Sequence, residues 1–134
     1  MIPRETSASI ELPVAREDAW LALADAASLT MEGEDQVLHF EHTDVVLDSV
    51  TAGEAAGGSG RWEGLQFRVA AHLVPMGADR TLLLLTAEAV EEPHGLRSTA
   101  HASAAHRHAR QDLEAMALAV GGLITRRDDT GATG

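Results

Sequence analysis

The chain has 134 residues, enough for one domain with a single core, and 45% of them are hydrophobic, which excludes disorder of the whole chain. Its formal net charge is −11, and its ten basic residues are all arginine. Because an acidic chain is repelled by the phosphate backbone and by anionic lipid surfaces, we expect neither nucleic acid nor a membrane among its partners.

Cysteine and apolar runs narrow the class of protein further. The absence of cysteine excludes disulfides, thiol catalysis and cysteine-ligated metal sites. No apolar run approaches the ~20 residues of a membrane-spanning helix, so no membrane insertion is expected. The first residues, MIPRETSAS, lack the apolar region of a secretory signal, and we expect the protein to be cytoplasmic.

The first two elements are predicted to be a strand and a helix. In SASIEL (residues 7–12) apolar and polar residues alternate with the period of a half-buried strand. Pro13 ends this strand, and AREDAWLALADAASL follows with the spacing of one helical face. That face consists of Trp20, Leu23, Ala24 and Ala27.

The residue pattern of 36–92 predicts strands connected by turns. VLHFEH and DVVLDSVT are strand candidates, whereas GEAAGGSG (residues 53–60) is predicted to be a loop because glycine costs entropy inside a regular element. LQFRVAAHLV and TLLLLTAEAVEE alternate clearly, and the short turn PMGADR between them predicts an antiparallel hairpin. The inward positions of this hairpin are Leu65, Phe67, Val69, Ala71, Leu73, Leu83, Leu85, Ala87 and Ala89.

The last element is predicted to be a long helix from about residue 103 to residue 119. Leu113, Met116, Ala117 and Val120 form its apolar stripe, and Gly121 and Gly122 are expected to end it. Residues 1–124 are therefore expected to be one domain, and 125–134 a flexible tail. A sheet with one apolar face needs a cover, and this helix is the only long amphipathic element left for it.

Three segments carry a resemblance to a known family. IELPVAREDAWLALAD looks like an opening strand and helix, RTLLLLTAEAVEEPHGL like a penultimate strand with a turn at Pro93 and Gly95, and ARQDLEAMALAV like a closing helix. In this order they resemble the START/polyketide-cyclase-like (SRPBCC) helix-grip superfamily. The resemblance implies an α+β fold, in which a curved antiparallel sheet wraps around a long C-terminal helix and a short helix follows the first strand. It also implies a central cavity for a small apolar molecule, such as a lipid, polyketide, quinone or isoprenoid.

The segment AHASAAHRHAR (residues 100–110) holds three of the seven histidines. At ~100° per residue, His106 falls on the apolar stripe, while His101 and His108 share another, exposed face. His108 and Asp112 are spaced for a weak ion pair or half of a metal site, but zinc needs three or four ligands, so no metal is expected.

Two polar residues on or beside the stripe have alternative roles. His106 could hydrogen-bond a ligand or act as a general base, or it could simply pack at the helix start, which we favour. Arg110 could pair with a ligand carboxylate, or its stem could cover apolar surface while its head reaches water, which we also favour. These two side chains are the candidates for any catalysis.

The sequence therefore predicts a carrier or sensor that binds a small apolar molecule between the sheet and the last helix, without a cofactor. One alternative is a polyketide cyclase- or dehydratase-like enzyme that uses His106 and Arg110. Another is a protein-interaction module with a filled core, and homodimer formation is left open. The predicted ligand-binding residues are Trp62, Phe67, Leu83, Leu85, His106, Arg110, Leu113 and Met116.

Overall fold

A computed structural model describes the backbone of residues 5–90 and 95–132 and the side chains of 5–90 and 100–126. Pro93, part of the turn named above, lies outside the described residues. In chain order the elements are β1 (Glu5–Leu12), α1 (Arg16–Ala26), β2 (Thr30–Glu32), β3 (Asp35–His39), β4 (Asp44–Thr51), β5 (Ala55–Trp62), β6 (Leu65–Gly77), β7 (Arg80–Ala89) and α2 (Gly95–Ala132).

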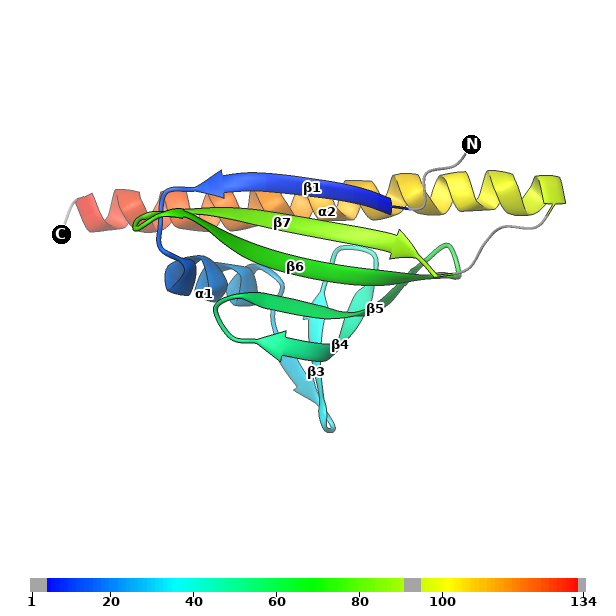
Figure 1. Ribbon diagram of the computed structural model, residues 1–134, viewed down its shortest axis with the longest axis horizontal. Coiled ribbons are helices and arrows are strands. Elements are labelled where there is room, and N and C mark those ends of the chain that lie inside the picture. The colour runs from blue at the N-terminus through cyan, green and yellow to red at the C-terminus, as the bar shows by residue number, and fades with distance from the viewer. Residues whose placement is uncertain (1–4, 91–94, 133–134) are drawn as a thin grey trace.

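The seven strands form one antiparallel sheet in the order β1-β7-β6-β5-β4-β3-β2. The sheet twists strongly, so that β3 runs steeply across the direction of β6 and β7 (Figure 1). The long helix α2 follows β1 and β7 and extends beyond them at both ends (Figure 1). The predicted fold class, a curved sheet with a short helix after its first strand and a long helix at the end, is confirmed.

The core lies between the concave face of the sheet and α2. The hairpin of β6 and β7 has the predicted alternation, with Phe67, Leu83 and Leu85 fully buried. On α2 the stripe residues Leu113 and Val120 are fully buried too. Removing each such side chain from water stabilises the fold by about 1.5–3 kcal/mol, so this face holds α2 on the sheet.

The glycine-rich segment 53–60 was predicted to be a loop, and this prediction is wrong. Most of it belongs to β5, a central strand that pairs with β4 on one side and β6 on the other. At Gly58 a Cβ atom would lie 2.1 Å from the carbonyl oxygen of Val46, beside the irregular pairing of Leu47 and Ser49. The missing side chain therefore allows close approach of β4 where the sheet bends, and this gain outweighs the entropic cost of glycine in a strand.

The predicted helix end at Gly121 and Gly122 is also wrong, because α2 continues to Ala132. A Cβ at Gly121 would lie 2.7 Å from Cδ1 of Ile10, so this glycine is where α2 approaches β1. Glycine ends a helix by adopting a left-handed conformation, but here it keeps the helical one. Residues 125–132, which were predicted to be tail, are consequently helical.

Candidate functional site

A buried carboxylate on α2 collects polar groups from two distant parts of the sheet. Asp112 is 1% exposed. Its Oδ2 accepts hydrogen bonds from Nε1 of Trp62 at 2.8 Å and from the main-chain N–H of His42 at 3.0 Å. Its Oδ1 lies 2.6 Å from Nδ1 of His42. Every oxygen of the buried carboxylate is thus paired, as a charge in the interior requires.

Local structure explains how Trp62 and His42 reach Asp112. Trp62 ends β5 and points inward because the strand alternates, and Glu63 and Gly64, with φ of 50° and 76°, then form a tight turn into β6. His42 lies in the short loop between β3 and β4, which the hydrogen bond from Phe40 N–H to the Thr43 carbonyl closes at 2.8 Å. The loop therefore presents both the main chain and the ring of His42 to α2.

The imidazole of His42 is oriented but still accessible. Its side chain is 62% exposed although its Nδ1 is bonded to a buried group. An ionised carboxylate only accepts hydrogen bonds, so Nδ1 carries the proton and Nε2 is left for a ligand or solvent. The hydrogen bond to Asp112 and the charge of Asp112 raise the pKa of His42 above its usual value.

A pocket of about 250 Å³ opens beside this pair. Its lining combines an aromatic ring with charged and amide side chains, from His42, Trp62, Glu63, His108 and Gln111. Nδ1 of His108 lies 2.5 Å from Oε1 of Glu63, and His101 bonds the main-chain oxygen of the same glutamate. Two of the three histidines in the segment 100–110 therefore hold α2 against the turn between β5 and β6.

Glu41, His42 and Asp112 bring three donor atoms within 4.8 Å of one another, which is close enough for a metal ion. Their bonding does not fit ligation. A metal bound through Nδ1 of His42 would need the lone pair of this nitrogen, but beside the Asp112 carboxylate Nδ1 donates a hydrogen bond at 2.6 Å. Oδ2 of Asp112 already serves two further donors. We therefore interpret the cluster as a positioned histidine and not as a metal centre.

The predicted ligand-binding residues fall into four groups. Trp62 lines the pocket just described, and Leu83, Leu85, Leu113 and Met116 are buried in the core. The guanidinium of Arg110 is exposed and donates to Glu114 at 2.9 Å. Phe67 and His106 continue inward from Trp62 as a column of edge-to-face rings, with centroid distances of 5.4 Å and 5.1 Å.

His106 faces inward as predicted and is 8% exposed. Its Nδ1 is buried without any hydrogen-bond partner among the described residues. Burial lowers the pKa of His106, so the neutral ring is favoured in the folded protein. Packing against Phe67 is therefore its visible role, and the free nitrogen is a polar position available inside an apolar core.

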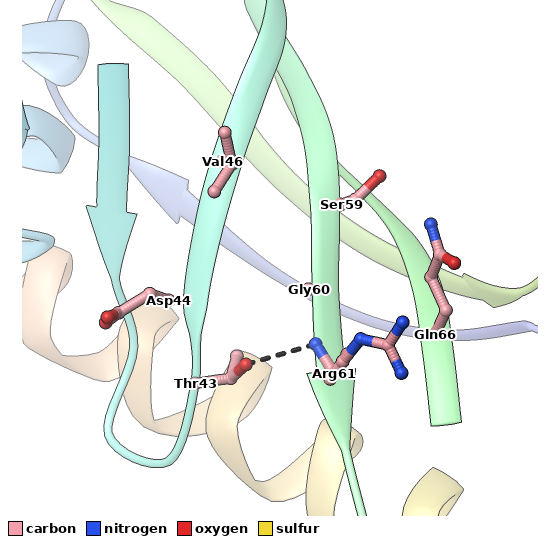
Figure 2. Close-up of a pocket in the computed structure, with 7 residues that line it drawn as sticks. All are labelled: Thr43, Asp44, Val46, Ser59, Gly60, Arg61 and Gln66. Atoms are coloured by element: carbon pink, nitrogen blue, oxygen red, sulfur yellow. Dashed lines mark hydrogen bonds between the residues drawn. The ribbon is translucent and has the colours of Figure 1, made fainter. Parts of the chain in front are cut away.

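Two other pockets are lined by described residues. One, beside Trp20 and Leu23 of α1, is apolar and has a volume of only about 10 Å³. The other, of about 400 Å³, lies on the outer face of the sheet, where Val46, Ser59 and Gln66 point the same way (Figure 2). Its floor is at Gly60, and Thr43 accepts a hydrogen bond from the N–H of Arg61 at 3.1 Å (Figure 2). None of the core residues predicted to bind ligand lines either pocket.

Sequence reasoning missed the central pair of the site. It considered Asp112 only as a partner of His108, one helical turn away, whereas its partner is His42, 70 residues earlier. The available signal was the position of Asp112 one helical turn before Met116 of the buried stripe, because a buried carboxylate requires partners. Which residues would supply them depended on the loop between β3 and β4.

Comparison with known proteins supports the fold assignment. No family model matches the sequence, and no curated protein matches it significantly. Among solved structures, the Zhui aromatase/cyclase from a Streptomyces species is 16% identical, with 92% of this chain and 94% of that chain covered and a TM-score of 0.56. A START superfamily protein from Mycobacterium smegmatis is 14% identical, with 91% and 97% covered and a TM-score of 0.60.

Norcoclaurine synthase from Thalictrum flavum is 15% identical, with 95% of this chain and 97% of that chain covered and a TM-score of 0.66. The chain thus has the helix-grip fold of START/polyketide-cyclase-like (SRPBCC) proteins, as the sequence resemblance implied. In the described part of the chain no helix is long and apolar enough to span a membrane. At these identities the likeness establishes the fold, and function has to be argued from the site.

Proposed function

We propose that the protein binds a small, partly apolar molecule in the pocket between the β3–β4 loop, the β5–β6 turn and α2. The observation that carries this proposal is the accessible imidazole of His42, held by the buried carboxylate of Asp112 at the edge of a pocket. A polar group that is already oriented loses little entropy on binding, which is how ligand sites gain affinity and specificity.

The lining indicates the chemistry of the ligand. The ring of Trp62 supplies an apolar wall, His42 a hydrogen-bonding nitrogen, and the exposed Gln111 an amide. A volume of about 250 Å³ lies just below the ~300–1,000 Å³ of pockets for drug-sized ligands. The pocket therefore suits a small ring compound with a carbonyl or carboxylate oxygen, or the polar end of a longer apolar molecule.

The apolar part of a longer ligand would follow the ring column into the core. Trp62 lies between the pocket and Phe67, and Phe67 contacts His106, whose Nδ1 is unpaired. A ligand that displaces these rings would reach the unpaired nitrogen of His106 as a hydrogen-bonding position. The proposal in this form retains the predicted internal site between sheet and helix, with the pocket at His42 as its entrance.

Two measurements test the binding proposal. Native mass spectrometry of the purified protein detects any molecule that copurifies with it. In the second, the protein is titrated with naphthoate, an aromatic ring with one carboxylate, and followed by NMR. We expect the indole N–H signal of Trp62 and the ring signals of His42 to shift, while the indole signal of Trp20 on α1 serves as an internal control.

The outcome separates binding from the interaction-module alternative. If no molecule copurifies and saturating naphthoate leaves the Trp62 and His42 signals unchanged, the pocket is not a ligand site. The closely packed core then favours a protein that acts through its surface. If Trp20 and Trp62 shift equally, binding is non-specific and the proposal fails as well.

A further inference from the structure

We propose that His42 is a general base that removes a proton from a small carbon acid bound in this pocket, with Asp112 as its positioning residue. This inference rests on the proposed ligand pocket and adds an activity to it. A carbon acid here means a compound with an acidic C–H bond next to an electron-withdrawing group, such as a carbonyl.

The geometry selects the reactive nitrogen. Asp112 is fixed by the indole N–H of Trp62 and the main-chain N–H of His42, so it cannot rotate away from the imidazole. It accepts a hydrogen bond from the Nδ1–H group and thereby stabilises the tautomer whose Nε2 bears the lone pair. A base that is oriented by a buried carboxylate in this way keeps both its tautomer and its direction throughout proton transfer.

The lining favours proton transfer over covalent chemistry. None of the five described side chains that line the pocket carries a hydroxyl or thiol nucleophile. The amide of Gln111 can instead donate a hydrogen bond to an oxygen that becomes negative when the C–H bond breaks. A general base and a hydrogen-bond donor in one small pocket are the parts that deprotonation of a carbon acid requires.

A second histidine–aspartate pair provides a matched control within the chain. Nδ1 of His39 lies 2.8 Å from Oδ1 of Asp44, a distance similar to that in the proposed dyad. The carboxylate of Asp44 is 61% exposed, whereas that of Asp112 is buried, and His39 does not line the pocket. The control therefore has the same histidine–aspartate contact without the buried orientation or the pocket, and its Nε2 is bonded to Oγ1 of Thr30 at 2.9 Å.

The charges around His42 determine how the activity depends on pH. Asp112 and, more weakly, Glu41 raise its pKa, and Glu63 and His108 face the same pocket as an ion pair. The basic form of His42 predominates only above its pKa. Activity should therefore rise with pH along a titration curve whose midpoint lies above the ~6.5 of an unperturbed histidine.

The probe for this activity is nitrobenzisoxazole, a flat ring compound with one acidic C–H bond. Nε2 of His42 takes that proton, the C–H electron pair becomes part of the nitrile triple bond, and the ring N–O bond breaks. The phenolate oxygen leaves with the electron pair of that bond, and the imidazolium returns its proton to water. The coloured phenolate reports the rate directly, and no oxidant, reductant or metal is needed.

Three variants test the assignment. A positioned general base contributes ~100-fold or more to a rate. We therefore expect His42→Gln to lower kcat/KM, and a loss of at least ~10-fold is the threshold for the assignment. Asp112→Asn keeps an oxygen for Trp62 and places an amide N–H opposite Nδ1, which favours the wrong tautomer. We expect a similar loss and a shift of the rate–pH curve to lower pH. His39→Gln should leave kcat/KM within ~2-fold of the unmodified protein, the scatter usual for a change away from the site.

NMR titration of the His42 ring makes the test independent of how well the variants fold. The pKa measured for this ring must match the midpoint of the rate–pH curve of the unmodified protein. Unchanged activity in His42→Gln, equal losses in His42→Gln and His39→Gln, or a mismatch of the two pKa values each overturns the inference. If naphthoate still shifts the Trp62 signal in that case, the binding proposal stands and only the catalytic role of His42 is wrong.

Discussion

Removing the carboxylate of Asp112 should destabilise the protein far more than a typical surface change. Asp112→Ala leaves two donors without a partner, the indole N–H of Trp62, whose residue is 2% exposed, and the main-chain N–H of His42. Each buried donor left unpaired costs about 1–3 kcal/mol, and release of the buried charge offsets part of this. We therefore expect a loss of about 2–4 kcal/mol in the free energy of unfolding.

Urea unfolding of three variants tests this estimate. Asp112→Asn retains an acceptor oxygen for both donors, so its loss should be about 1 kcal/mol. Glu114→Ala, an exposed change on the same helix that removes only the pair with Arg110, should stay within about 0.5 kcal/mol of the unmodified protein. If Asp112→Ala is as stable as Glu114→Ala, the hydrogen bonds to Asp112 do not stabilise the fold and the reasoning is refuted.

Three further predictions concern pH and glycine. Burial lowers the folded-state pKa of His106, so the unfolded state binds a proton first and the stability of the protein falls as pH drops below ~6.5. His106→Met should remove this loss and raise the free energy of unfolding by about 1 kcal/mol, because it eliminates an unpaired buried nitrogen. Equal acid sensitivity of the two proteins would contradict this prediction. For His42 the folded pKa is raised, so its stabilising contribution is complete below ~6.5 and is lost as pH rises through the folded value. In urea titrations, the stability advantage of the unmodified protein over His42→Gln should thus shrink with rising pH, and an advantage that grows would be the wrong sign. Gly58→Ala should lower the free energy of unfolding by more than about 2 kcal/mol, because its Cβ would meet the backbone of Val46. Gly122→Ala, with open space around it, should raise that free energy by about 0.5–1 kcal/mol. Thermal unfolding that ranks the two variants in the opposite order would disprove the proposed strand packing.

The position of the His42–Asp112 pair follows from the way the curved sheet of the helix-grip fold packs against α2. Asp112 lies on the part of α2 that faces the end of β5, and His42 lies in the loop that leads into β4. The hydrogen bonds from Trp62 and His42 therefore tie both the middle of the sheet and its far side to the helix. The same contacts that stabilise this closure orient the imidazole toward the pocket, so stability and the proposed activity depend on one carboxylate.

Local periodicity was enough to predict the main elements of the fold, and the resemblance of three segments to helix-grip proteins supplied the fold class. The alternation in residues 65–74 and 81–89 defined a hairpin with one apolar face, and the stripe through Leu113 and Val120 defined the helix that covers it. Such patterns are readable without a structure because strands and helices repeat every two and 3.6 residues, so burial on one side leaves a periodic trace in the sequence.

Only the tertiary structure decided which polar residues meet and what the glycines do. Asp112 bonds His42 across 70 residues of chain, and the contact exists because the curved sheet brings the β3–β4 loop onto α2. Likewise glycine stands within a strand at position 58 and within a helix at position 121 because a neighbouring element comes too close there for a side chain. Close approach and long-range pairing leave no periodic trace, since they depend on the partner segment and not on the residues alongside in the chain.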